Sequence, residues 1–173
     1  MFTRRSLVAG TAATALAAGI PALPAEAQEK EKAHPLKPAT CQSLVGLLAN
    51  PAAIRATVDT SLGSWGVGTT LKVAGLGPSL RHLADVGDAL AQLPPEKLKP
   101  LAQAGTAIQA NECSLTLTHL STVLTHIQAQ NVGLDLNHIW KLLDWMGYSR
   151  NFTFTSAEFR AMLNAVQAPT PAR

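Results

Sequence analysis

The sequence has little charge, few aromatic side chains and only two cysteines. Charged residues make up 14% and aromatic residues 5% of the 173 residues. A typical soluble domain has about 25% charged residues, so more of this surface is apolar or neutral polar, which favours a partner that covers part of it. The formal net charge is only +3, and no basic stripe is present. The sequence therefore excludes a nucleic-acid-binding surface of the usual basic kind.

Motifs of the common enzyme and cofactor classes are also absent. The chain has no Gly-Lys-Ser/Thr phosphate loop, no Cys-x-x-Cys pair for redox chemistry or haem attachment, and no Gly-x-Ser-x-Gly elbow. Gly66 and Gly68 begin like a dinucleotide fingerprint, but Leu71 stands where the third glycine is needed. We therefore expect a chain that is not an enzyme and has no cofactor or metal site of its own.

The N-terminus has the pattern of a cleaved export signal. Arg4 and Arg5 precede a mildly apolar stretch at residues 7–20, and the small residues of Ala-Glu-Ala at 25–27 form a cleavage site that leaves Gln28 first. The stretch is too short and weak for a membrane span, which needs about 20 apolar residues. The arginine pair resembles a twin-arginine signal, although the usual neighbouring Phe and Lys are missing. The ordinary secretory route is the alternative, and both predict a periplasmic protein.

The rest of the chain has the size of one domain. Residues 28–39 are rich in charge and proline and are expected to form a flexible leader, and the proline-rich residues 168–173 are expected to form a tail. Residues 40–167 then form a single domain. This organisation predicts a signal at 1–27, a leader, one helical domain and a tail, with no transmembrane span.

The two cysteines of the domain are predicted to form one disulfide. Cys41 and Cys113 form an even pair in an oxidising compartment. The bond closes a loop of about 70 residues, which is worth roughly 4 kcal/mol in the chain-entropy model. A structural role is favoured over a redox role, because the spacing is not that of a redox pair.

Apolar residues at helical spacing predict an all-α fold of six or seven short helices around one core. A capping box at residues 155–158 marks one helix start. Five glycines within residues 61–79 predict a glycine-rich loop, with a possible short strand at 69–74. The predicted helices begin at Thr40 or Cys41, Asn50, Pro78, Pro95, Asn111, Asp135 or Asn137, and Thr155.

Four aromatic residues are candidate interface residues. Trp65 lies in the glycine-rich loop, where a tryptophan either fills its own core or anchors a partner. Trp140, Trp145 and Tyr148 lie on a helix that is apolar nearly all round, and one apolar stripe suffices for its core contact. The alternative is a central helix that is surrounded by its own neighbours.

The histidines give no strong site prediction. His119 and His126 are seven residues apart on one helix face, and a rise of ~1.5 Å per residue separates them by about 10 Å. One metal ion cannot bridge that distance, so a solvated or partner-facing surface is favoured. His82 precedes Asp85 by three residues, as in ordinary helical charge pairing, and His138 stands alone near a helix start.

An exported chain of this size without cofactor motifs resembles, in its layout, the small third subunits of membrane-bound quinoprotein alcohol dehydrogenases of acetic-acid bacteria. The resemblance implies a non-catalytic accessory subunit that stabilises or helps to mature a larger periplasmic or membrane-bound oxidoreductase subunit. That partner would carry pyrroloquinoline quinone and haem. The resemblance extends to the overall plan only and transfers no site residues.

Two other functions remain open. One is a free-standing periplasmic helical protein that binds a small apolar ligand in a pocket near Trp65, Trp140 and Trp145. The other is an enzyme without a recognisable signature, which would use His119 or His126 as a base. That reading needs a cleft in which one of these histidines meets Glu112 or Asp144.

Overall fold

The computed structural model of the chain describes residues 31–149 and 152–167. The fold is all-α, as predicted, with one small antiparallel sheet in the described part. The predicted signal (1–27) and tail (168–173) lie outside the described residues. In chain order the elements are β1 (Ala33–Pro35), α2 (Pro38–Ala49), a 3-10 helix (Pro51–Ala53), α3 (Ile54–Gly63), α4 (Val67–Val73), α5 (Gly77–Ala91), α6 (Pro95–Ala110), β2 (Ser114–Thr116), α7 (Leu117–Ala129), α8 (Leu136–Ser149) and α9 (Ser156–Gln167).

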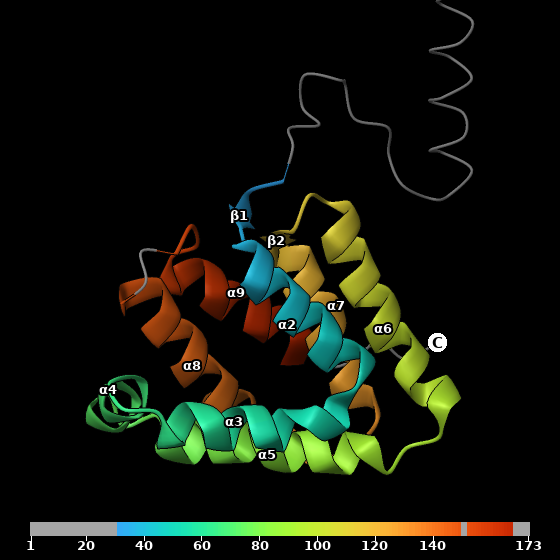
Figure 1. Cartoon of the computed structure of the whole chain (residues 1–173). Helices are drawn as coiled ribbons and strands as arrows, with labels where there is room; N and C mark the ends of the chain where they lie inside the picture. The colour runs from blue at the N-terminus through green and yellow to red at the C-terminus, as the bar shows by residue number, and fades with distance from the viewer. Residues whose placement is uncertain (1–30, 150–151, 168–173) are drawn as a thin grey trace, which may run out of the picture. The chain divides into compact units, whose positions relative to one another are not determined.

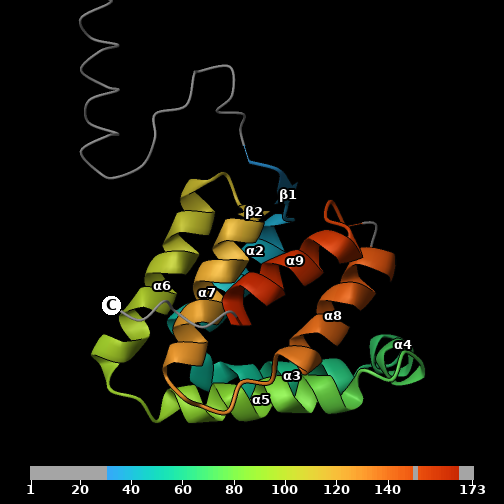
Figure 2. The same ribbon diagram turned by 180° about the vertical axis from the view of Figure 1, so that it is seen from behind.

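The helices of the domain form a base and two sides (Figure 1). Helices α3 and α5 lie antiparallel to one another across the base, and α4 lies at one end of it. Helices α2 and α6 pack together on one side, and α8 packs on α9 and α5 on the other. Figure 2, which views the domain from behind, shows α7 and α9 between the two sides.

Two apolar clusters of the core share α7. The larger cluster joins α7, α8 and α9 around Phe154 and Phe159, whose rings meet edge to face at 5.7 Å. The smaller cluster joins α5, α6 and α7 around Leu90 and Leu101. The buried residues of α9 recur at helical spacing: Phe159, Met162, Leu163 and Val166.

The predicted disulfide is confirmed. Cys41 and Cys113 are bonded with 5.8 Å between their Cα atoms, and Cys41 is 1% exposed. The bond ties the first turn of α2 to the turn between α6 and β2. Glu112 and Cys113 both have positive φ values in that turn, 56° and 55°, a conformation that L residues disfavour. The disulfide therefore lies in a turn whose backbone conformation is unfavourable for L residues, and it holds that turn against α2.

The predicted flexible leader at 28–39 is wrong for its second half. Ala33 pairs with Thr116 and Pro35 with Ser114, so β1 is a strand of the small sheet. The N–H of Leu36 also donates to the carbonyl of Cys113 at 2.9 Å. Helix α2 then begins at Pro38, a residue suited to the first helical turn. A three-residue strand leaves no periodic signal, because its order depends on a partner strand far along the chain.

The predicted strand at 69–74 is also wrong, because residues 67–73 form helix α4, which adds an eighth helix to the seven expected starts. Two glycines with positive φ flank the helix rather than interrupt it: Gly66 (87°) precedes it and Gly75 (71°) follows it. Gly68 lies inside α4 where a Cβ would stand 2.2 Å from the carbonyl oxygen of Leu62. The glycines thus permit the turns and the close contact between α3 and α4.

The helix caps agree with the sequence in part. The capping box of α9 is confirmed: the Glu158 N–H donates to Thr155 Oγ1, and the Thr155 N–H donates to the Glu158 carboxylate. Asn111, however, is the C-cap of α6 and does not start the next helix. Helix α7 starts six residues later, with Thr116 as its N-cap. The turn between α6 and α7 contains β2, which the helical pattern had concealed.

Candidate functional site

The most exposed apolar side chains of the described residues lie at one corner of the domain. Trp65 is 96% exposed, Val73 is 85% exposed and Val67 is also exposed. They lie in or just before α4, which packs against the end of α3 and stands at the edge of the fold (Figure 1). We call residues 65–73 the α4 corner. The exposure excludes one of the two expected roles of Trp65, because its ring fills no core of this domain.

The local sequence explains why the α4 corner projects. Gly66 turns the chain sharply just after Trp65, and its φ of 87° suits glycine. Leu71 is buried, whereas Val67 in the first turn of α4 and Val73 at its end are exposed. The α4 corner is therefore anchored by one apolar residue and by close backbone contact at Gly68, which leaves its other apolar side chains to water.

A shallow pocket joins the end of α4 to α8. It has a volume of about 360 Å³ and is lined by residues 74–76 after α4 and by Lys141, Asp144 and Trp145 of α8. Figures 1 and 2 both place α4 beside α8, on the same side of the domain. The structure thus brings the segment after α4 and the half-buried Trp145 together in one pocket.

A larger groove lies on the other side of Trp145. It has a volume of about 580 Å³. It lies between residues 32–37, which we call the β1 segment, the end of α8 and the chain before α9. We call it the β1 groove. Its main lining residues are His34, Leu36, Lys37, Trp145, Met146 and Phe152. Trp145 lines both hollows, so the two meet at this residue.

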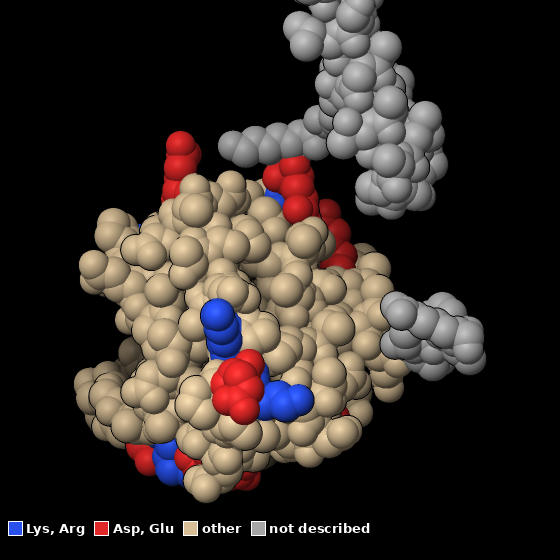
Figure 3. All heavy atoms as spheres, turned by 90° about the vertical axis from the view of Figure 1, so that its right-hand side faces the viewer, with Lys and Arg blue, Asp and Glu red and all other residues tan. Residues whose placement is uncertain are grey.

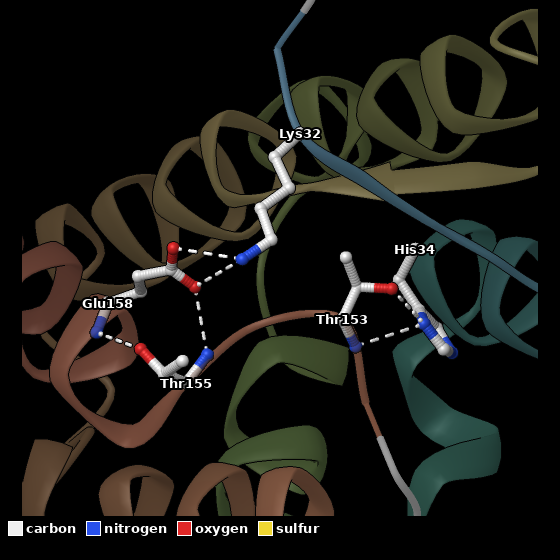
Figure 4. A network of polar contacts seen from close by, with 5 residues as sticks. All are labelled: Lys32, His34, Thr153, Thr155 and Glu158. Atoms are coloured by element: carbon white, nitrogen blue, oxygen red, sulfur yellow. Dashed lines mark hydrogen bonds and ion pairs between the residues drawn. The ribbon is translucent and has the colours of Figure 1, made fainter.

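Polar contacts fasten the β1 segment to the first turn of α9 and to the chain before it (Figure 4). Lys32 Nζ lies 3.0 Å from the Glu158 carboxylate. The Thr155 N–H donates to that carboxylate at 2.8 Å, and this bond, with the Lys32 ammonium, lowers the pKa of Glu158. Next to this pair, Thr153 binds the ring of His34. Two contacts therefore hold the wall of the β1 groove: the ion pair of Lys32 with Glu158 and the hydrogen bonds of His34 with Thr153.

His34 is held in one tautomer by these contacts. The Thr153 N–H points to Nδ1 at 3.3 Å and the Thr153 hydroxyl lies 2.8 Å from the same nitrogen. Nδ1 is thus an acceptor, and the neutral ring carries its proton on Nε2. The ring stacks on Phe152 with 3.8 Å between centroids, and burial lowers the pKa of His34. A neutral N–H donor therefore lies in the wall of the groove.

The other two candidate interface residues differ from Trp65 and Trp145. Trp140 packs against the larger core cluster, and the guanidinium of Arg160 lies 3.9 Å from its ring centroid. The Trp140 ring is thus in contact with residues of its own domain, which agrees with the alternative that its helix is surrounded by its own neighbours. The side chain of Tyr148 lies outside the described residues.

The candidate histidines have structural partners. His119 completes the capping box of α7: its Nδ1 accepts from the Thr116 N–H and its own N–H donates to Thr116 Oγ1, each at 3.1 Å. His126 Nε2 lies 2.7 Å from the carbonyl oxygen of Lys97. Within the described ranges, no hydrogen bond joins either histidine to Glu112 or Asp144, and Asp144 instead accepts from Ser156 Oγ. No group of three or more metal-binding side chains occurs in those ranges.

Sequence reasoning missed a polar cluster between α5 and α8. Ser79 Oγ lies 3.0 Å from His138 Nδ1, and the rings of His82 and His138 stack with 4.7 Å between centroids. The Asp135 N–H donates to His82 Nε2 at 2.9 Å. Ser79 and His82 share a helix face by their spacing, but only tertiary packing brings His138 to them. Because Ser79 is 1% exposed, the cluster fastens α8 to α5 and offers no open nucleophile.

The surface agrees with the low charge of the sequence. Figure 3 views the domain from the α6 side, and neutral side chains cover most of that face while charged ones gather in small groups. Two acidic residues of α5, Asp85 and Asp88, both bind Arg55 of α3, at 2.5 and 2.6 Å. Charge is thus used in local pairs and leaves wide neutral areas.

Comparison with models of known protein families, with curated proteins and with solved structures finds no match to this chain. Among the described helices, none combines the length and the apolar character that crossing a membrane requires.

Proposed function

We propose that the chain is a non-catalytic accessory subunit that docks on a larger periplasmic or membrane-bound oxidoreductase subunit and stabilises it or helps it to mature. The layout of the sequence supports the class of partner, one that carries pyrroloquinoline quinone and haem. The α4 corner supports the docking role. The N-terminal export pattern and the disulfide support the compartment, because disulfides persist where the environment is oxidising.

The single observation that carries the docking role is the exposure of Trp65. An indole that is 96% exposed gives up the free energy of burying a large apolar side chain, about 1.5–3 kcal/mol for residues of this kind. Tryptophan is also among the residues that most often dominate binding energy at interfaces. Val67 and Val73 of the α4 corner are exposed as well, so a partner that covers the α4 corner gains the free energy of burial that folding leaves unused.

A second candidate function is a free-standing protein that binds a small apolar ligand. The β1 groove favours it, since its volume of about 580 Å³ lies within the range of small-molecule sites. The ligand would contact Trp145 and neither Trp65 nor Trp140, so the second function makes no use of the α4 corner.

The test is a gentle detergent pull-down of the tagged chain from its own membranes, with mass spectrometry and a visible absorption spectrum. Three proteins are compared: wild type, Trp65→Ala, and Gln103→Ala as an exposed control on α6, away from the α4 corner. The proposal predicts stoichiometric recovery of a haem- or quinone-bearing oxidoreductase with the wild type and Gln103→Ala, and a large loss with Trp65→Ala. A lone, colourless chain, or recovery that ignores Trp65, contradicts it.

A further inference from the structure

The β1 groove has an apolar part and a polar part that lie next to one another. The apolar part is formed by Trp145, Met146 and Phe152. Phe152 is itself fixed, because its ring stacks on His34 and lies 5.8 Å from the ring of Phe154. A preformed aromatic wall of this kind suits an alkyl chain, which gains free energy from every CH₂ group that leaves water.

The polar part of the groove offers two donors for an anion. Lys37 is exposed and has no ion pair within the described part of the chain. His34 carries its proton on Nε2, because Nδ1 accepts from Thr153. Lys32, the other cation of this segment, is already engaged by Glu158 (Figure 4). An anion in the groove would therefore meet one free ammonium and one ring N–H.

The charge of the groove lining is one-sided. Lys37 is its only charged residue among those described, and no Asp or Glu lines it. The smaller pocket beside α4 differs, because Lys141 and Asp144 both line it and offset one another. Of these two hollows, the β1 groove is the one that combines an aromatic wall with an uncompensated positive charge, and that combination selects an anionic amphiphile.

We propose that the β1 groove binds a long-chain carboxylate, with the alkyl chain on Trp145, Met146 and Phe152 and the carboxylate between Lys37 and His34. The carboxylate accepts from the Lys37 ammonium and from His34 Nε2–H, and both bonds are charge-assisted because the acceptor is ionised. This binding site is separate from the docking role of Trp65, so either proposal can fail without the other.

The experiment uses dodecanoate below its micellar concentration as the probe. Calorimetric titration measures its affinity, and the indole N–H resonance of Trp145 reports its position. Butanoate keeps the carboxylate but lacks the chain, and dodecanol keeps the chain but lacks the charge. The proposal predicts one-to-one binding of dodecanoate with a shift of the Trp145 resonance and no measurable butanoate binding. It predicts an affinity for dodecanol that is at least about tenfold weaker, because an alcohol offers Lys37 and His34 no charged acceptor.

Two matched lysine variants locate the carboxylate. Lys37→Gln is expected to lower dodecanoate affinity about tenfold, because the bond from His34 remains, whereas Lys141→Gln in the smaller pocket leaves the affinity unchanged. Trp65→Ala also leaves it unchanged. Absence of dodecanoate binding, equal affinity for dodecanol, indifference to Lys37→Gln, or a shift at Trp65 in place of Trp145 each overturns the proposal.

Discussion

Trp140 on α8 and Trp65 before α4 lie in regions of opposite character. Trp140 packs against the larger core cluster on one side and is covered by the guanidinium of Arg160, 3.9 Å from its ring centroid, on another. Trp65 is 96% exposed on a corner that is anchored by Leu71 and by a close backbone contact at Gly68. The α8–α9 region uses its aromatic residues to hold the fold together, whereas the α4 corner leaves its apolar side chains available for contact with another molecule.

The largest expected effect is in the α8–α9 region. Phe159 is 0% exposed and lies in the larger cluster, so Phe159→Ala is expected to lower the free energy of unfolding by about 3–5 kcal/mol, as for a large core cavity. Val67→Ala at the α4 corner is the control, with a change within about 0.5 kcal/mol. Urea unfolding measures both, and similar costs for the two variants would break the comparison.

The disulfide comes next, because it holds α2 to the turn after α6. Replacing both Cys41 and Cys113 by Ala is expected to cost about 2–4 kcal/mol, the usual value for a disulfide that closes a long loop. Thermal unfolding measures the loss, with reduction of the wild type as the parallel arm. An unchanged melting temperature would show that the strained turn at Glu112 holds without the bond.

The two tryptophans give the most direct stability comparison. Trp140→Ala is expected to cost about 1–3 kcal/mol, less than a fully buried tryptophan because the side chain is half-buried. Trp65→Ala is expected to change stability by no more than about 0.5 kcal/mol. Chemical denaturation of the two variants in the same buffer measures both free energies of unfolding. A larger loss of stability for Trp65→Ala would mean that Trp65, and not Trp140, supports the fold.

Two glycines sharpen the comparison at the level of the backbone. A Cβ would meet nothing within 4 Å at Gly46 of α2 or at Gly66, but Gly66 has a φ of 87°. Gly46→Ala is expected to raise stability by up to about 1 kcal/mol, because alanine favours a helix interior. Gly66→Ala is expected to cost about 1–2 kcal/mol through its left-handed backbone. Equal effects from the two substitutions would mean that the turn before α4 adapts to alanine.

The smallest expected effect is the pH response of the β1 segment. Burial lowers the native pKa of His34, so the unfolded chain binds this proton more readily and stability rises with pH. The contribution is complete above about 6.5, the ordinary imidazole value, and is lost as pH falls through the lower native pKa. Urea midpoints from pH 8 to pH 5 should therefore fall less for His34→Gln than for the wild type, and parallel curves would contradict this.

Local patterns predicted the parts of the fold that depend on nearby residues. The capping box at Thr155 and the buried face of α9 follow from spacing and side-chain chemistry. The disulfide followed from the number of cysteines and the export pattern. In each case the physical cause lies within one helix turn or in the compartment, and the sequence displays it.

The features that the sequence concealed depend on distant contacts. Strand β1 exists because Ala33 meets Thr116, and no three-residue pattern announces such a pair. Helix α4 was hidden because glycines that flank a helix look, in the sequence, like glycines that prevent one. The exposure of Trp65 depends on how α4 packs, and the groove at Trp145 depends on how β1 pairs. Neither arrangement can be read from local sequence, so both roles of Trp65 stayed open.

The most direct test of the docking account measures two properties of Trp65→Ala side by side: its free energy of unfolding and its affinity for the oxidoreductase recovered by the wild-type chain. The account predicts an affinity at least about tenfold weaker, as for a buried interface anchor, with a free energy of unfolding that stays within about 0.5 kcal/mol of the wild type. An unchanged affinity, or a loss of affinity that merely follows a loss of stability, would contradict it.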